Sequence, residues 1–203
     1  FLIMPGILNA DFVITQSEIF NYAYLEAYEE HTGRRANKKK YLALGSPIID
    51  KVISTKKENL SIPDTWKEII ADKKTILYNT SVQGFLNSGQ KTLEKMKNVF
   101  RIFMEQDAFI LLWRPHPLSL ATISRMTPHL LSEYKELVDF FKNNKVGIYD
   151  DTSDVYRAIA LSDAYYGMGG SLLTMFRSSG KPAMVQAITL IYDIIHDDSM
   201  GST

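Results

Sequence analysis

The chain has 203 residues, of which 45% are hydrophobic and 23% are charged, a composition typical of a globular domain with a full apolar core. Lysine and arginine together number 23, as do aspartate and glutamate, so bulk charge does not favour binding to nucleic acid or to an anionic membrane. The absence of cysteine excludes disulfides, thiolate metal sites and thiol chemistry, and no apolar run reaches the roughly 20 residues of a membrane-spanning helix.

The first third of the chain contains short elements separated by polar segments. Gly33 is a helix-ending signal after a segment that begins at Ser17, a suitable N-cap, and the basic run 34–40 that follows reads as a solvated loop. Pro63 interrupts the polar segment 54–73 and marks it as a connector. The expected elements are a strand over 11–15, a helix over 17–31, a strand over 41–44 and a short helix near 66–71.

From residue 74 onward, apolar strands alternate with helical patterns. Leu93, Met96, Phe100 and Phe103 recur at helical spacing, whereas the strand segments are almost continuously apolar, as in a parallel sheet buried on both faces. We therefore predict an α/β fold: a Rossmann-like parallel sheet with helices on both faces. The expected strands are 75–79, 109–113, 146–149, 164–167 and 183–186. The expected helices are 89–105, a long helix somewhere between 120 and 143, 153–161, and 171 to about 178.

Ligands of an open parallel sheet bind beyond the carboxyl ends of its strands, so the residues after each strand are the candidates for a site. These residues should converge at one edge of the sheet. We expect neither a metal nor a cofactor there. The candidate catalytic residue is His116, and the candidate substrate-binding residues are Asn79, Thr80, Arg114, Asp151, Gly169, Gly170 and Ser171.

The sharpest motif is Trp-Arg-Pro-His-Pro at 113–117, because two prolines fix the backbone that carries Arg114 and His116. Arginine offers a planar fork for phosphate oxygens, and histidine can donate to a phosphate or act as a general acid or base. The alternative is structural: a loop histidine that caps backbone groups and an Arg114 held in a salt bridge.

The glycine pair at 169–170 permits close approach of a ligand to the backbone, and the helix that begins at Ser171 favours an anion at its N-terminus. A tight strand-to-helix turn with Ser171 as N-cap explains the same residues. Asp150 and Asp151 fit caps of the helix over 153–161 better than metal ligands.

The order and spacing of several segments resemble the C-terminal domain of the CDP-glycerol glycerophosphotransferase family, the teichoic-acid polymerases, which have the GT-B fold. Segments 13–18 and 44–47 resemble the end of the N-terminal domain of that family and the crossing into the second domain. The matching segments of the C-terminal domain are 113–117 (Trp-Arg-Pro-His-Pro), 147–151 (Gly-Ile-Tyr-Asp-Asp), 160–164 (Ala-Leu-Ser-Asp-Ala) and 179–182 (Ser-Gly-Lys-Pro).

The resemblance implies transfer of glycerol phosphate or ribitol phosphate from a CDP-alditol to a polymer or lipid-linked acceptor. His116 matches a family histidine beside the donor pyrophosphate, Arg114 would neighbour the same phosphates, and Ser171 matches the second serine of a pair at a helix start. The chain departs from the family at 168–171, where Met-Gly-Gly-Ser stands for an Asp-Tyr-Ser-Ser type segment. The Trp-His-Gly segment of the family's N-terminal domain, which carries the proposed base, is also absent.

The domain organisation follows from the same resemblance. We expect the end of an N-terminal domain and the crossover in 1–50, a connector in 51–73, the nucleotide-binding domain in 74–192 and a tail in 193–203. The opening residues do not form a signal peptide. We expect a piece of a larger cytoplasmic protein, inactive alone, with a peripheral contact at the inner membrane face through the parent protein.

Two rival functions stay open. The first is a GT-B enzyme that uses a UDP-sugar, either a glycosyltransferase or an epimerase-like protein, which the turn at 169–171 suits equally well. The second is a degenerate, non-catalytic binding domain, which the altered turn at Met168 favours.

Overall fold

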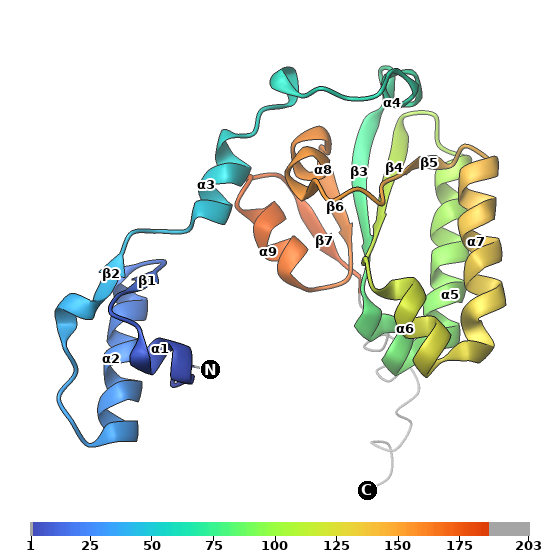
Figure 1. Ribbon diagram of the computed structural model, residues 1–203. Helices are drawn as coiled ribbons and strands as arrows, with labels where there is room; N and C mark the ends of the chain where they lie inside the picture. Colours follow the sequence, from blue (N-terminus) through green and yellow to red (C-terminus); the bar gives the residue numbers. More distant parts are fainter. Residues whose placement is uncertain (1, 187–203) are drawn as a thin grey trace, which may run out of the picture. The chain divides into compact units, whose positions relative to one another are not determined.

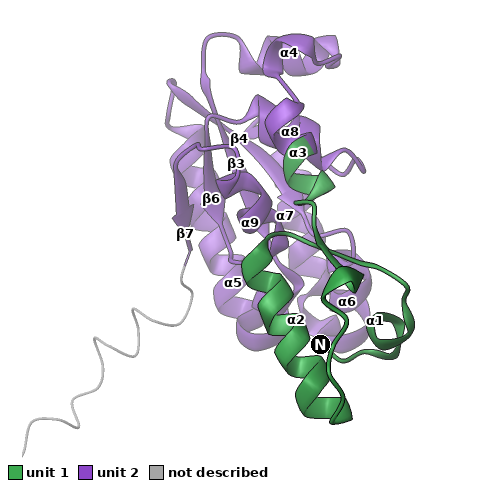
Figure 2. Cartoon of the chain, turned by 90° about the vertical axis from the view of Figure 1, so that its left-hand side faces the viewer, with its two compact units in different colours: residues 1–50 green, residues 51–203 purple. Residues whose placement is uncertain are grey.

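The computed structural model describes residues 2–186 and divides the chain into two compact units, residues 1–50 and residues 51–203 (Figure 2). The predicted tail 193–203 and the last residues of the predicted segment 74–192 lie outside the described residues. The assignment of 1–50 to the end of a preceding domain stays a prediction.

The first unit is a pair of parallel strands joined by a helix. Asn21, near the start of that helix, accepts a hydrogen bond from the Thr15 hydroxyl and donates one to the Tyr41 carbonyl over 3.2 Å, which ties the helix to both strands. Gly33 adopts a φ of +65° and ends the helix as predicted. Its elements are α1 (Pro5–Asn9), β1 (Val13–Thr15), α2 (Glu18–Thr32), the 3-10 helix η1 (Lys38–Lys40) and β2 (Tyr41–Ala43). A further helix, α3 (Pro47–Ser54), spans the boundary between the units.

The second unit contains a five-stranded sheet in the order β5-β4-β3-β6-β7, with every described pair of neighbours parallel. Its strands are β3 (Lys74–Thr80), β4 (Phe109–Pro115), β5 (Gly147–Tyr149), β6 (Ala164–Gly167) and β7 (Ala183–Val185). Its helices are η2 (Lys57–Asn59), α4 (Asp64–Ile70), α5 (Val82–Met104), α6 (Ser119–Met126), η3 (Pro128–Leu130), α7 (Leu131–Asn143), α8 (Val155–Leu161) and α9 (Ser171–Arg177).

Helices cover both faces of this sheet: α5 and α7 lie on one side, and α8 and α9 lie on the other (Figure 1). On the first side, Phe100 and Phe141 pack against Trp113 with ring centroids 4.9 and 5.1 Å away. On the second side, Tyr165 packs against Phe176 at 5.5 Å. The predicted fold class, a Rossmann-like parallel sheet with helices on both faces, is confirmed.

The long helix predicted somewhere between 120 and 143 is present as α7, but a second helix, α6, precedes it and is not predicted. The structure has two helices, α6 and α7, separated at Thr127 and Pro128. Proline lacks the N–H group that a continuous helix needs and disfavours helical geometry at the residue before it, and Thr127 accordingly has φ −136° and ψ 56°. The strand predicted over 109–113 runs on to Pro115, which places Arg114 inside β4. The helix α3 was not predicted.

Gly147 allows the close contact between β5 and β4, because a Cβ atom there would lie 2.0 Å from the backbone oxygen of Leu111. We expect Gly147→Ala to lower the free energy of unfolding by at least about 2 kcal/mol, since backbone cannot yield as a side chain can. Urea unfolding of the whole chain measures this change. Gly169→Ala is the matched control, because no atom lies within 4 Å of its added Cβ. Equal stability of the two variants would contradict this account.

Candidate functional site

The register of the sheet brings the predicted candidates to one edge. Asn79 of β3 lies opposite Arg114 of β4 and opposite Gly167 of β6, so the three strands end at the same level. The chain builds β3, β4 and β5 in one direction and then crosses to β6 and β7 on the other side of β3. The strand order therefore reverses beside β3, the place where open parallel sheets bind ligands.

A buried ion pair fixes the ends of β4 and β5. The Nη1 atom of Arg114 lies 2.6 Å from Oδ2 of Asp150, and the pair is almost fully enclosed, with 8% and 0% of the two residues exposed. Arg114 also donates from Nη2 to the Thr152 carbonyl over 2.7 Å, while Asp150 Oδ1 accepts from the Thr152 N–H and hydroxyl. Arg157 of α8 donates to the same hydroxyl over 3.0 Å. Arg114 is therefore held in a salt bridge, as the structural alternative for the 113–117 motif predicts.

The preferred interpretation of Asp150 and Asp151 as helix caps is wrong. Asp150 is consumed in the ion pair and Asp151 is exposed at the edge. The cap of α8 is Asp154, whose carboxylate accepts from the Arg157 N–H over 3.0 Å. Helix α8 begins two residues later than predicted, which moves the cap position past both earlier aspartates.

His116 is exposed and held by its own loop. Its N–H donates to the Thr80 carbonyl over 3.2 Å, and its carbonyl accepts from the Ser119 N–H over 2.8 Å. The ring atom Nδ1 accepts from the Leu118 N–H over 3.1 Å, so in the neutral ring the proton lies on Nε2. The two flanking prolines and these three hydrogen bonds fix the direction of the His116 ring, whose Nε2–H group remains as a donor.

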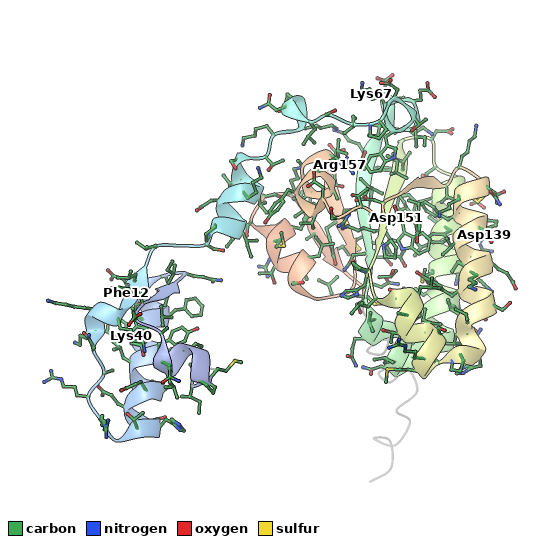
Figure 3. All side chains as sticks on the ribbon, in the orientation of Figure 1. Phe12, Lys40, Lys67, Asp139, Asp151 and Arg157 are labelled. Atoms are coloured by element: carbon green, nitrogen blue, oxygen red, sulfur yellow. The ribbon has the colours of Figure 1, made fainter. Side chains whose placement is uncertain are left out.

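A cavity of about 430 Å³ opens beside His116 at the ends of β4 and β5. Of the predicted residues, Arg114, His116 and Asp151 line it. The opposite wall comes from α7, which sequence reasoning did not single out; Asp139 of this wall and Asp151 are labelled in Figure 3. Lys135, Asp139 and Lys142 follow the i, i+4, i+7 spacing of one helix face. Nothing in the sequence around them indicates that this face lines a cavity. The residues of the α7 wall are Tyr134, Lys135, Val138, Asp139 and Lys142.

The two tyrosines of the cavity have pKa values above the usual range. Burial raises the pKa of Tyr134, and the neighbouring Tyr149 adds to this rise. Burial also raises the pKa of Tyr149, and the nearby Asp151 carboxylate adds to that rise. The Lys142 ammonium lies 4.1 Å above the Tyr149 ring. Both phenols therefore remain neutral hydrogen-bonding groups at physiological pH.

Met168 directly follows β6 and is 5% exposed, and its N–H donates to the Asn79 carbonyl at the end of β3 over 3.1 Å. Its sulfur accepts from the Ser81 N–H at 3.3 Å and from the Ser81 hydroxyl at 3.0 Å, at the start of α5. The side chain of Asn79 donates to the Tyr165 hydroxyl over 3.3 Å. This part of the edge is closed by internal contacts.

The remaining predicted residues lie outside the cavity. Thr80 is fully buried and accepts from Trp113 Nε1 over 3.2 Å. Gly169, Gly170 and Ser171 are exposed after β6; Ser171 is the first residue of α9, and Gly170 occupies the N-cap position that the structural interpretation gave to Ser171. The candidates thus share one edge but not one cavity.

Lys181, from the predicted family segment 179–182, lies away from the cavity at the C-terminal end of α8. Its ammonium donates to the carbonyl oxygens of Ile159, Ala160 and Ser162 at 3.0, 3.0 and 2.7 Å. Burial lowers the pKa of Lys181, and the nearby Asp163 acts in the opposite direction. This part of the motif therefore closes a helix end.

Within residues 2–186, no three histidine or acidic side chains come together as a metal site. None of the described helices is both long and apolar enough to cross a membrane.

No protein-family model matches the sequence, and none of the curated proteins does. The structure is similar to that of the wall teichoic acid polymerase TagF soaked with CDPG, with 16% identity and a TM-score of 0.51 over 89% of this chain and 38% of that chain. A histidine variant of TagF is 16% identical, with a TM-score of 0.52 over 92% of this chain and 41% of that chain. A protein assigned as a UDP-N-acetylglucosamine 2-epimerase from Listeria monocytogenes is 13% identical, with a TM-score of 0.58 over 87% of this chain and 42% of that chain.

The chain thus spans about two fifths of the length of these structures. At such identities the likeness is one of fold. The fold is the Rossmann-like α/β arrangement found in GT-B glycosyltransferases and their relatives.

We expect Asp150→Asn to lower the free energy of unfolding by about 3–5 kcal/mol, because Arg114 would keep its buried position without a counter-charge. Replacing both partners, Arg114→Met with Asp150→Leu, should cost clearly less than this single change. Thermal unfolding of the whole chain measures both variants. Asp64→Asn, which breaks an exposed ion pair with Lys67, is the control and should leave the midpoint unchanged. A double variant less stable than Asp150→Asn would contradict this account.

Proposed function

We propose that this chain is the nucleotide-binding part of a GT-B transferase that moves glycerol phosphate from CDP-glycerol, or a related CDP-alditol, to a polymer or lipid-linked acceptor. The observation that carries the proposal is the cavity at the ends of β4 and β5, into which the rigid 113–117 motif brings His116. The fold likeness to TagF, one structure of which was soaked with CDPG, supports it.

In this proposal the chain binds and orients the donor. The Nε2–H group of His116 donates to the pyrophosphate, and the exposed turn of Gly169, Gly170 and Ser171 offers backbone that a phosphate can approach. Arg114 acts mainly through the ion pair that shapes the edge, beside the same phosphates. Asn79 and Thr80 hold the edge together through their own partners.

The chemical step joins an acceptor hydroxyl oxygen to the phosphorus that carries glycerol, and the bond from that phosphorus to CMP breaks. Positioning and charge stabilisation supply most of the catalysis of such a transfer. The acceptor site and the general base that takes the hydroxyl proton belong, in this proposal, to the remainder of the parent protein. A cytoplasmic location, a peripheral contact with the inner membrane face and the absence of a nucleic-acid partner stay predictions.

Two rival functions each have an observation in their favour. The TM-score of 0.58 with the epimerase, against 0.51 with TagF, favours a UDP-sugar enzyme. The buried Met168 side chain favours a degenerate, non-catalytic binding domain, since its thioether, bonded to Ser81, occupies the switch point of the sheet. The preferred nucleotide base separates the first rival from the proposal, and nucleotide binding itself separates the second.

We expect CDP to bind the whole chain more tightly than UDP, and His116→Ala to weaken CDP binding roughly tenfold or more, since a donor to a charged phosphate is lost. Isothermal titration calorimetry measures both effects. His129→Ala is the matched control, because His129 is exposed and does not line the cavity. Preference for UDP would support the sugar enzymes, and failure of both nucleotides to bind would contradict the proposal for this chain.

A further inference from the structure

An apolar groove of about 550 Å³ lies between α5 and the two strands β6 and β7. Tyr166 of β6 stacks on Tyr78 of β3, with ring centroids 5.7 Å apart, and Met184 is the neighbour of Tyr166 in β7. Tyr78 also contacts Phe100 of α5, so these side chains belong to the face of the sheet that α5 covers. Every residue that lines this β6–β7 groove is apolar or aromatic.

The two faces of β6 and β7 are covered unequally. On the face opposite the groove, Tyr165 packs against Phe176 of α9. On the groove face, Met184 is 67% exposed, Ile102 is 52% exposed and Phe109 is 41% exposed. Apolar surface left in water forgoes about 25 cal/mol of stabilisation per Å², and a cluster of such side chains marks a contact surface. The β6–β7 groove is therefore a surface that gains from being covered.

The chain itself supplies an apolar segment beside this groove. Strand β7 ends at Val185, Gln186 follows it, and the sequence continues directly into the segment 187–197. The polar residues of that segment follow the spacing of one helix face, and the others are apolar or aromatic. The polar residues are Thr189, Asp193, His196 and Asp197. A helix with this pattern has a broad apolar face to bury.

The length of the segment fits the groove. A helix over 187–197 is about 16 Å long at 1.5 Å per residue. The strand from Pro182 to Gln186 spans about 13 Å at 3.3 Å per residue, and Pro182 lines the far end of the groove. A helix that turns back after β7 therefore covers the groove along its length. The chain makes the same reversal at β3, where Ser81 alone separates the strand from α5.

The charges beside the groove match those of the segment. Lys91, Lys95 and Val99 follow one another at four-residue intervals in α5, so they share one flank of that helix. Val99 lines the groove, which places the two lysines on its side of α5. The polar face of the segment carries Asp193 and Asp197. Attraction between these charges favours the chain's own segment as the occupant.

We infer that residues 187–197 form an amphipathic helix that packs into the β6–β7 groove beside α5. All three residues of β7 are exposed in the described structure, and this helix gives the strand a second covered face, opposite α9. The groove shares no lining residue with the cavity beside His116, so its occupancy is independent of the proposed function.

NMR of the whole chain, with labelled isoleucine and methionine methyl groups, tests this contact directly. We expect nuclear Overhauser effects that join the methyl groups of Ile191 or Ile195 to those of Ile102 or Met184. Ile191→Asp, on the apolar face of the segment, should remove these signals and speed hydrogen exchange of the β7 amides about tenfold or more. Thr189→Asp adds the same charge to the polar face and is the matched control, which should change neither.

A second pair of variants tests the groove side. Met184→Ser should lower the midpoint of thermal unfolding by about 2–4 °C, because the helix would lose an apolar partner. Met126→Ser, at a position that is 66% exposed against 67% for Met184, should leave the midpoint unchanged. Absence of the methyl contacts, or equal effects within either pair of variants, would overturn the inference. Contacts that appear only together with dimers in analytical ultracentrifugation would also overturn it, since a second copy would then fill the groove.

Discussion

The buried ion pair between Arg114 and Asp150 is the contact on which the functional edge depends. It joins residues 36 positions apart, closes the ends of β4 and β5, and reaches α8 through Thr152 and Arg157. A buried charge is tolerated when it is paired and hydrogen-bonded, and here Arg114 and Asp150 bond to Thr152 as well as to each other. The loop that carries His116 leaves β4 after Pro115, one residue beyond Arg114, so the pair fixes the strand end from which this loop starts.

The edge of the sheet at the carboxyl ends of its strands has two parts, one filled by side chains and one that contains a cavity. At the ends of β3 and β6, the Met168 sulfur accepts hydrogen bonds from the Ser81 N–H and hydroxyl, so this part of the edge is filled by the chain itself. Beside β4 and β5, the α7 wall stands far enough away to leave a cavity lined by both signs of charge. A parallel sheet of this kind has one switch point by topology, but its side chains decide where along the edge a ligand can enter.

The sequence predicts the sheet well because buried parallel strands are nearly continuous apolar runs, and such a run is visible within a few neighbouring residues of the sequence. It also predicts that the candidates share an edge. It cannot predict that Thr80 bonds to Trp113 or Asn79 to Tyr165, because those partners come from other strands and depend on side-chain direction. The break between α6 and α7 could be predicted from Pro128, because proline disfavours a continuous helix. The α7 wall could not be predicted, because it depends on how that helix is rotated against the sheet.

Lys181 closes the end of α8 from a distance of about twenty residues, with three carbonyl oxygens around one ammonium group. Because a chain is synthesised from its N-terminus, α8 emerges before the residue that completes it. During translation this helix is left with open carbonyl groups until the turn before β7 has been made. The closure of α8 therefore has to wait for Lys181, which stands just before β7.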